Sequence, residues 1–139
     1  MKKKVLAMFV AICLCVLCVV PANALSEDSK IDEVMTPNYL YTAVTSTHLS
    51  ISSGTASISA SINGIMGTTT RTQVYAYLEK YVNGSWTSLY MFYASADTFY
   101  CDLFGYYSVP SGYSYRVRAS YYAYAGSAYE NIVAFSNTV

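Results

Sequence analysis

The feature that most constrains the fold of this sequence is a strict alternation of apolar and polar side chains between Thr55 and Ile62. Successive residues of a β-strand point to opposite faces, so a period of two predicts a strand with one buried face and one wet face. No later stretch shows the 3.6-residue period of an amphipathic helix. An all-β domain is therefore predicted. The apolar members of the run are Ala56, Ile58, Ala60 and Ile62.

A second local signal is the dipeptide Asn83-Gly84, which separates two alternating runs at residues 71–81 and 85–93. Both residues tolerate the positive φ angles of a type I′ turn, and this turn matches the twist of the strands that flank it. The pattern predicts a two-residue β-hairpin at this position.

Similar runs continue to the end of the chain and predict seven short strands. Gly, Asn and Pro separate the runs every 8–12 residues, a spacing typical of an immunoglobulin-like or fibronectin type III-like sandwich. A different sandwich topology, such as a jelly roll, fits the alternation as well. The predicted strands are residues 40–52, 55–62, 71–81, 85–93, 97–104, 112–124 and 129–138.

The N-terminal segment has the three parts of a secretory signal peptide. Three lysines follow Met1, residues 5–20 carry no charge, and Ala22-Asn23-Ala24 supplies a small-x-small cleavage site. The uncharged run is shorter than the roughly 20 residues of a membrane-spanning helix. We expect cleavage after Ala24, which makes residues 1–24 the signal peptide and the product secreted; an uncleaved N-terminal anchor is the alternative.

Removal of residues 1–24 changes what the rest of the chain can form. Residues 25–38 are polar and acidic and predict a flexible linker, which leaves residues 39–139 as the β-sandwich domain. Only Cys101 of the four cysteines remains, so no internal disulfide is expected. Five basic and eight acidic residues remain, which is not the charge balance of a nucleic-acid-binding protein. We expect no cofactor, no metal and, after cleavage, no membrane contact.

The stretch from Val109 to Ala119, with Pro110, Gly112 and Tyr115, resembles the corner before strand F of fibronectin type III-like domains. The resemblance implies that Tyr115 lies in the core with its hydroxyl bonded to nearby backbone. Residues 49–56 and 78–86 are similar to an uncharacterised family of small secreted Firmicutes-type proteins with one such domain. That family implies no catalytic residues. Trp86, the one tryptophan, is assigned a structural role together with Tyr115.

Catalytic groups are scarce after residue 24. The remaining chain has one histidine, His48, and one cysteine, Cys101. In the alternation of its strand, Cys101 shares a face with Phe99 and Leu103, which predicts that it is buried. Metal sites and hydrolytic relays need more such groups. Glu79, the carboxylate between Tyr77 and Tyr81, is expected to be a solvated charge on a wet strand face. We therefore expect a protein that is not an enzyme.

Tyrosine is the side chain that stands out, because all sixteen tyrosines follow residue 24. In the predicted strands 71–81 and 112–124, the residues that point away from the core include both tyrosines and arginines. These two strands would be neighbours in a fibronectin-like sheet. We expect a face that binds a cell-surface protein or a glycan. Two alternatives are a face that only stabilises the sheet and a structural protein that forms homo-oligomers. The candidate ligand-binding residues are Tyr75, Tyr77, Tyr81, Arg116, Arg118, Tyr122 and Tyr124.

Overall fold

The computed structural model describes residues 38–139, and these residues form seven antiparallel strands and no helix. The predicted signal peptide and all but the last residue of the predicted linker lie outside the described residues. The prediction of an all-β domain with seven strands is confirmed. The strands are β1 (Thr42–Ser52), β2 (Thr55–Gly64), β3 (Arg71–Val82), β4 (Ser85–Ala96), β5 (Tyr100–Ser108), β6 (Tyr115–Ala125) and β7 (Ala128–Phe135).

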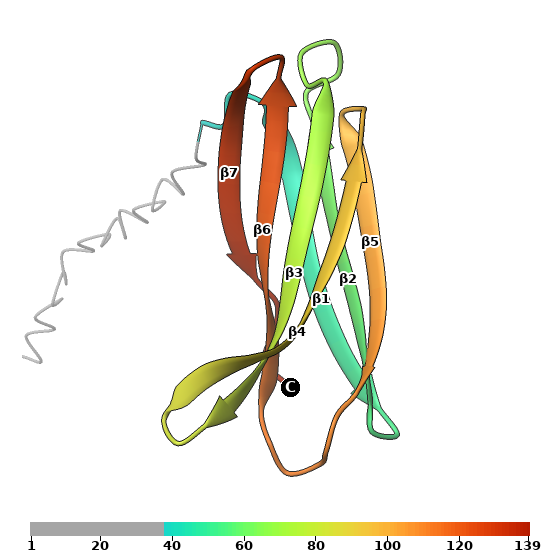
Figure 1. Cartoon of the computed structure of the whole chain (residues 1–139), viewed down its shortest axis with the longest axis vertical. Coiled ribbons are helices and arrows are strands. Elements are labelled where there is room, and N and C mark those ends of the chain that lie inside the picture. The colour runs from blue at the N-terminus through green and yellow to red at the C-terminus, as the bar shows by residue number, and fades with distance from the viewer. Residues whose placement is uncertain (1–37) are drawn as a thin grey trace, which may run out of the picture. The chain divides into compact units, whose positions relative to one another are not determined.

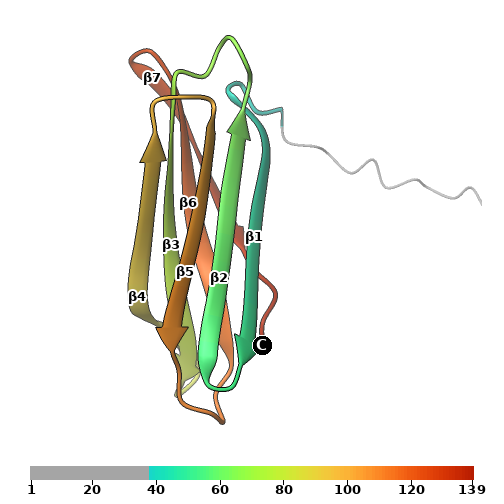
Figure 2. The same ribbon diagram turned by 90° about the vertical axis from the view of Figure 1, so that its right-hand side faces the viewer.

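The strands form two sheets that pack face to face (Figure 1). One sheet has the order β1-β2-β5 and the other has the order β4-β3-β6-β7. Figure 2 shows the sheet β1-β2-β5 in front of the other sheet, with β4 and β5 on the same side of the molecule. Each sheet therefore has an inner face toward the core and an outer face toward solvent.

The core follows from the alternation in the sequence. The apolar residues predicted to share one face of β2 are all buried, and the polar residues between them lie on the outer face. On β6, Tyr115 and Tyr121 are both buried among small apolar side chains. Burial of whole aromatic side chains supplies much of the apolar area that a domain of this size needs.

The predicted hairpin joins β3 to β4, and Asn83 and Gly84 have φ angles of 50° and 81°. Positive φ at both positions is what a type I′ turn requires. Further along the hairpin, the register shifts by one residue between Leu78 and Glu79, where β4 carries an extra residue. This β-bulge changes which side chains of β4 face outward beyond it.

The ends of several predicted strands were wrong; the fourth strand continues to Ala96 rather than ending at residue 93, and the sixth begins at Tyr115 rather than at Gly112. The fifth strand begins at Tyr100 rather than at Asp97 and continues to Ser108. The last strand ends at Phe135, because Ser136 and Val139 pair only intermittently with the β6 backbone.

Candidate functional site

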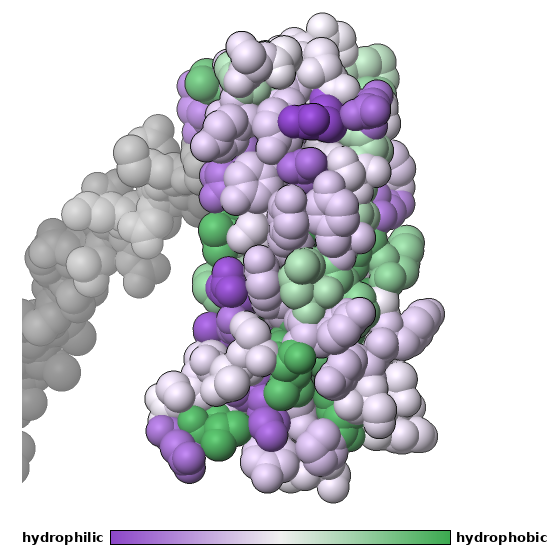
Figure 3. Space-filling view, in the orientation of Figure 1, coloured by the Kyte–Doolittle hydropathy of each residue, from purple (hydrophilic) through white to green (hydrophobic). Residues whose placement is uncertain are grey.

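The predicted ligand-binding residues all lie on the outer face of the four-stranded sheet. Strand β3 pairs with β6, so the two tyrosine- and arginine-bearing strands are neighbours. Figure 3 shows this face as a broadly even surface on which strongly hydrophilic and strongly hydrophobic side chains are scattered among others of intermediate hydropathy. The cross-strand pairs on it include Arg71 with Tyr124, Gln73 with Tyr122, Tyr77 with Arg118 and Glu79 with Arg116.

One part of the face is a cluster of five tyrosines, which we call the tyrosine cluster. Tyr75 packs on Tyr93 with ring centroids 4.7 Å apart and meets Tyr122 edge-on at 5.8 Å. Tyr122 and Tyr124 also contact Tyr129, at 6.0 and 5.6 Å. These separations are typical of stabilising aromatic pairs. The cluster is therefore a continuous layer of rings across all four strands.

Polar groups fix the rings of the tyrosine cluster from one side. The Gln73 amide donates to the Tyr93 hydroxyl at 3.1 Å and accepts from the Tyr124 hydroxyl at 3.0 Å. The Arg71 guanidinium lies 4.0 Å from the centroid of the Tyr124 ring, in cation–π geometry. Desolvation first, and then the neighbouring Tyr93, raise the pKa of Tyr75 above its ordinary value. The raised pKa keeps the Tyr75 hydroxyl protonated near neutral pH.

The second part of the face is organised by Glu79. Its carboxylate accepts from Nε of Arg116 at 2.8 Å and from Nε of Arg118 at 2.9 Å. Glu79 is only 5% exposed, although it lies on the outer face. The expectation of a solvated charge at this position was wrong, because the two arginines of the neighbouring strand cover the carboxylate. The three side chains form what we call the arginine cluster.

The arginine cluster is packed between aromatic rings. Arg118 lies 4.4 Å from the centroid of the Tyr77 ring. Arg116 lies 4.3 Å from Trp86 and 4.5 Å from Phe135. The Arg116 and Arg118 side chains remain 25% and 33% exposed, so each is partly accessible to solvent. The cations are thus held in place and still reachable.

The structure places five of the seven predicted residues in these two clusters and the other two, Tyr77 and Tyr81, beside them; Arg116 and Arg118 belong to the arginine cluster. Tyr75, Tyr122 and Tyr124 belong to the tyrosine cluster, and Tyr77 lies against Arg118. Tyr81 is half exposed and packs on Trp86 at 5.2 Å. Tyr115 lies on the inner face of β6 and donates to the Pro110 carbonyl at 2.6 Å.

Sequence reasoning missed three aromatic residues and one methionine of this face on the edge strands, and it gave Trp86 a structural role only. The partner of Tyr75 could not be assigned from the two-residue turn, because the bulge in β4 shifts the register by one residue. Without the bulge, Phe92 would lie opposite Tyr75. The missed residues are Met91, Tyr93, Tyr129 and Phe135.

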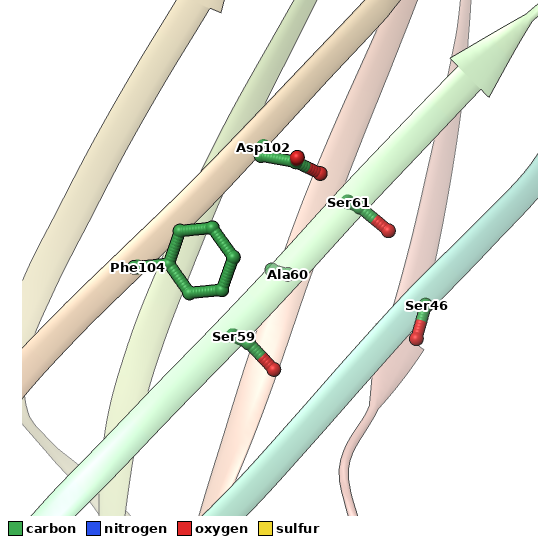
Figure 4. A pocket seen from close by; sticks show the side chains of 6 residues that line it. All are labelled: Ser46, Ser59, Ala60, Ser61, Asp102 and Phe104. Atoms are coloured by element: carbon green, nitrogen blue, oxygen red, sulfur yellow. The ribbon is translucent and has the colours of Figure 1, made fainter.

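A shallow hollow of about 140 Å³ lies on the other sheet (Figure 4). Serines of β1 and β2 form its floor, and Asp102 and Phe104 of β5 lean over it. The hollow therefore belongs to a different surface from the tyrosine and arginine clusters. Its lining is Ser46, Ser59, Ala60, Ser61, Asp102 and Phe104.

The remaining reactive groups are isolated from one another. His48 is exposed on β1, whereas Cys101 is buried, and burial raises the pKa of its thiol. Across residues 38–139, no three acidic, histidine or cysteine side chains converge on a point that could hold a metal ion. The same part of the chain contains no helix of the length and apolarity needed to cross a membrane.

Comparison with known proteins adds no functional assignment. No protein-family model matches the chain, and no curated protein is significantly similar to it. The function must therefore be argued from the two clusters themselves.

Proposed function

We propose that the chain is an exported, non-enzymatic binding module that recognises a protein partner through the tyrosine and arginine clusters. The observation that carries this proposal is the fixed position of the aromatic and guanidinium groups, which pack on one another before any partner binds. Rigid tyrosine, tryptophan and arginine side chains dominate the binding energy of protein interfaces. Groups already held in place lose little conformational entropy on binding.

Two observations support a fibronectin type III-like class for the sandwich. The sheets have the orders β1-β2-β5 and β4-β3-β6-β7, in which the chain crosses between the layers after β2, β4 and β5, as in that class. The Tyr115 hydroxyl also bonds back to the carbonyl five residues upstream, which is the geometry of a tyrosine corner.

The shape of the face favours a protein over a glycan. Small ligands bind in concave sites, whereas the hollow found within residues 38–139 lies on the other sheet. The clusters extend over four strands, and Tyr81, Met91, Tyr93 and Tyr129 are all at least partly accessible around them. A broad, even surface with central anchors and an exposed rim suits a macromolecular partner.

Export is supported by the N-terminal sequence and by the character of the domain. The lysines, the uncharged run and the Ala22-Asn23-Ala24 site have the order of a cleavable signal. The domain has its one cysteine, Cys101, buried in an apolar core, so it needs no disulfide to fold. Such a domain would be compatible with an oxidising environment.

The proposal is tested by binding the exported chain to immobilised peptidoglycan, mucin and surface proteins stripped from Gram-positive cells. A quadruple variant carries Tyr75→Ser, Tyr77→Ser, Tyr122→Ser and Tyr124→Ser. A control variant, Val44→Ser, removes an exposed apolar side chain from β1 of the other sheet. We expect binding to a protein fraction that only the quadruple variant loses.

Pretreatment of the immobilised material separates the two ligand classes. Protease should abolish binding, and periodate, which cleaves sugar diols, should leave it intact. Loss with periodate alone would identify a glycan ligand and contradict the protein proposal. Equal binding by the wild type and the folded quadruple variant, with folding checked by circular dichroism, would exclude this face as the binding surface.

A further inference from the structure

Strand β5 is an edge strand without the usual protection against pairing with another strand. It ends the sheet β1-β2-β5, so the backbone groups that point away from β2 have no neighbouring strand. Its nine residues pair with β2 without a register shift and include no proline, lysine or arginine. Bulges, prolines and basic side chains are the devices that normally block an exposed edge.

The opposite edge of the same sheet is fastened by side chains. The Asn137 amide both donates to the Leu49 carbonyl and accepts from the Leu49 amide of β1, at 3.0 and 3.3 Å. The Tyr121 hydroxyl donates to the Ser46 carbonyl at 2.5 Å. Within residues 38–139, no side chain from another strand makes such a bond to the backbone of β5. The two edges of this sheet are therefore protected unequally.

The neighbouring edge strand β4 also differs from β5. It carries the bulge near Leu89, which interrupts its ladder. It covers the inner side of β5 rather than its edge, since Phe92 packs against Gly105 and Tyr90 stacks on Tyr107. On the outer side, Asp102 and Phe104 lean toward β2 and away from the free edge (Figure 4). The edge of β5 is left open between these two layers.

We propose that β5 pairs antiparallel with β5 of a second copy of the chain, around a two-fold axis at Phe104. This is the register that pairs all nine residues of the strand. It places Phe104 opposite Phe104 of the second copy and Asp102 opposite Tyr106, whose hydroxyl can donate to the carboxylate. A register centred on Asp102 would instead place two carboxylates opposite each other, which is unfavourable.

The exposure of these side chains fits such a pairing. Phe104 is 72% exposed and Tyr106 is 74% exposed, although both are large and apolar. Aromatic pairs directly across a strand pair stabilise the sheet. The product would be a six-stranded sheet shared by two chains, a closed two-fold assembly. The tyrosine and arginine clusters lie on the other sheet, so this inference does not depend on the proposed function.

Disulfide cross-linking tests the register directly. Residues directly opposite in an antiparallel pair have Cα atoms about 4.5–5.5 Å apart, within the range that a disulfide bridges. Phe104→Cys should therefore give a covalent dimer under mild oxidation. Tyr106→Cys should react at least about tenfold more slowly, because the two copies of residue 106 lie more than about 13 Å apart in this register. The wild type controls for the buried Cys101.

Light scattering during size-exclusion chromatography tests the association itself. We expect a reversible dimer whose dissociation constant rises at least tenfold in Phe104→Lys, which brings two like charges together at the axis. Val44→Lys, on the exposed face of β1, should leave the dimer intact. A monomer at every concentration up to the millimolar range would overturn the proposal. So would an unaffected Phe104→Lys dimer, or cross-linking at residue 106 that is as fast as at residue 104.

Discussion

Glu79 shows how a single residue determines the character of the outer face. It is the one acidic side chain among the buried residues of the described chain, and both of its carboxylate oxygens are engaged by arginines. Leaving one member of such a network without its partner is costly, because the remaining charges lose their compensation. Glu79 therefore holds Arg116 and Arg118 in the positions that the proposed function needs.

Replacement of Glu79 tests this role. Glu79→Gln keeps the shape of the side chain and removes the charge, so we expect the free energy of unfolding to fall by about 1.5–3 kcal/mol. Urea denaturation provides the measurement. Asp97→Asn, which removes an exposed charge, serves as the control. A loss for Glu79→Gln no larger than that of the control would show that the arginines do not depend on the carboxylate.

Tyr115 is the second residue whose contribution can be isolated. Tyr115→Phe removes the hydroxyl that donates to the Pro110 carbonyl and keeps the buried ring. We expect a loss of about 1–2 kcal/mol in the free energy of unfolding. Tyr113 lies two residues earlier and its ring is exposed, so Tyr113→Phe should change the free energy of unfolding by far less. Similar values for the two variants in thermal or urea unfolding would contradict a stabilising corner.

Gly105 links the sequence to the packing between β5 and β4. A Cβ atom at this position would lie 2.4 Å from the Phe92 ring, so the two strands approach closely only because the residue is glycine. Gly105→Ala should therefore cost about 1–3 kcal/mol of unfolding free energy. The cost should shrink when Phe92→Ala is introduced as well, because the clashing ring is then absent. Additive losses in this double-mutant cycle would rule out the contact as the cause.

The elements were predictable from the sequence where one face is core and the other is wet. The alternation at β2 and the Asn83-Gly84 turn define their elements locally, and the structure has both. The bulge in β4 has no comparable local signal, and it decides that Tyr93 rather than Phe92 joins the tyrosine cluster. The pairing of β3 with β6 came from the interpretation of the fold class, since alternation contains no information about strand order. The burial of Glu79 depends on that pairing, because Arg116 and Arg118 of β6 cover its carboxylate. It could not be predicted without knowing that these arginines lie on the neighbouring strand.

At the scale of the whole molecule, the buried tyrosines make the free energy of unfolding depend on pH in the alkaline range. Burial raises the pKa of Tyr115 and Tyr121, and desolvation raises that of Tyr75. As pH rises through the ordinary tyrosine value of about 10, the unfolded chain releases these protons first. The unfolded state then binds fewer protons than the folded state, so the free energy of unfolding falls.

We therefore expect these groups to have no effect on the pH dependence of the unfolding free energy below about pH 9. Above about pH 9, they should lower the unfolding free energy progressively. Urea denaturation at a series of alkaline pH values gives the measurement. Tyr115→Phe should show a shallower decline than the wild type, because one of the titrating groups is gone. A stability that increases through this range would have the wrong sign for buried tyrosines.

The most direct test of the account is the dissociation constant between residues 25–139 and a protein captured in the proposed binding experiment. Tyr77→Ala and Arg118→Ala change the centre of the proposed surface, and Val44→Ala and Tyr113→Ala change exposed side chains that lie outside both clusters and outside β5. Loss of a central anchor should weaken binding at least about tenfold, as interface hot spots do. The account predicts that only the first pair weakens binding. Equal dissociation constants for all four folded variants and the wild type, or weakening by the second pair alone, would contradict it.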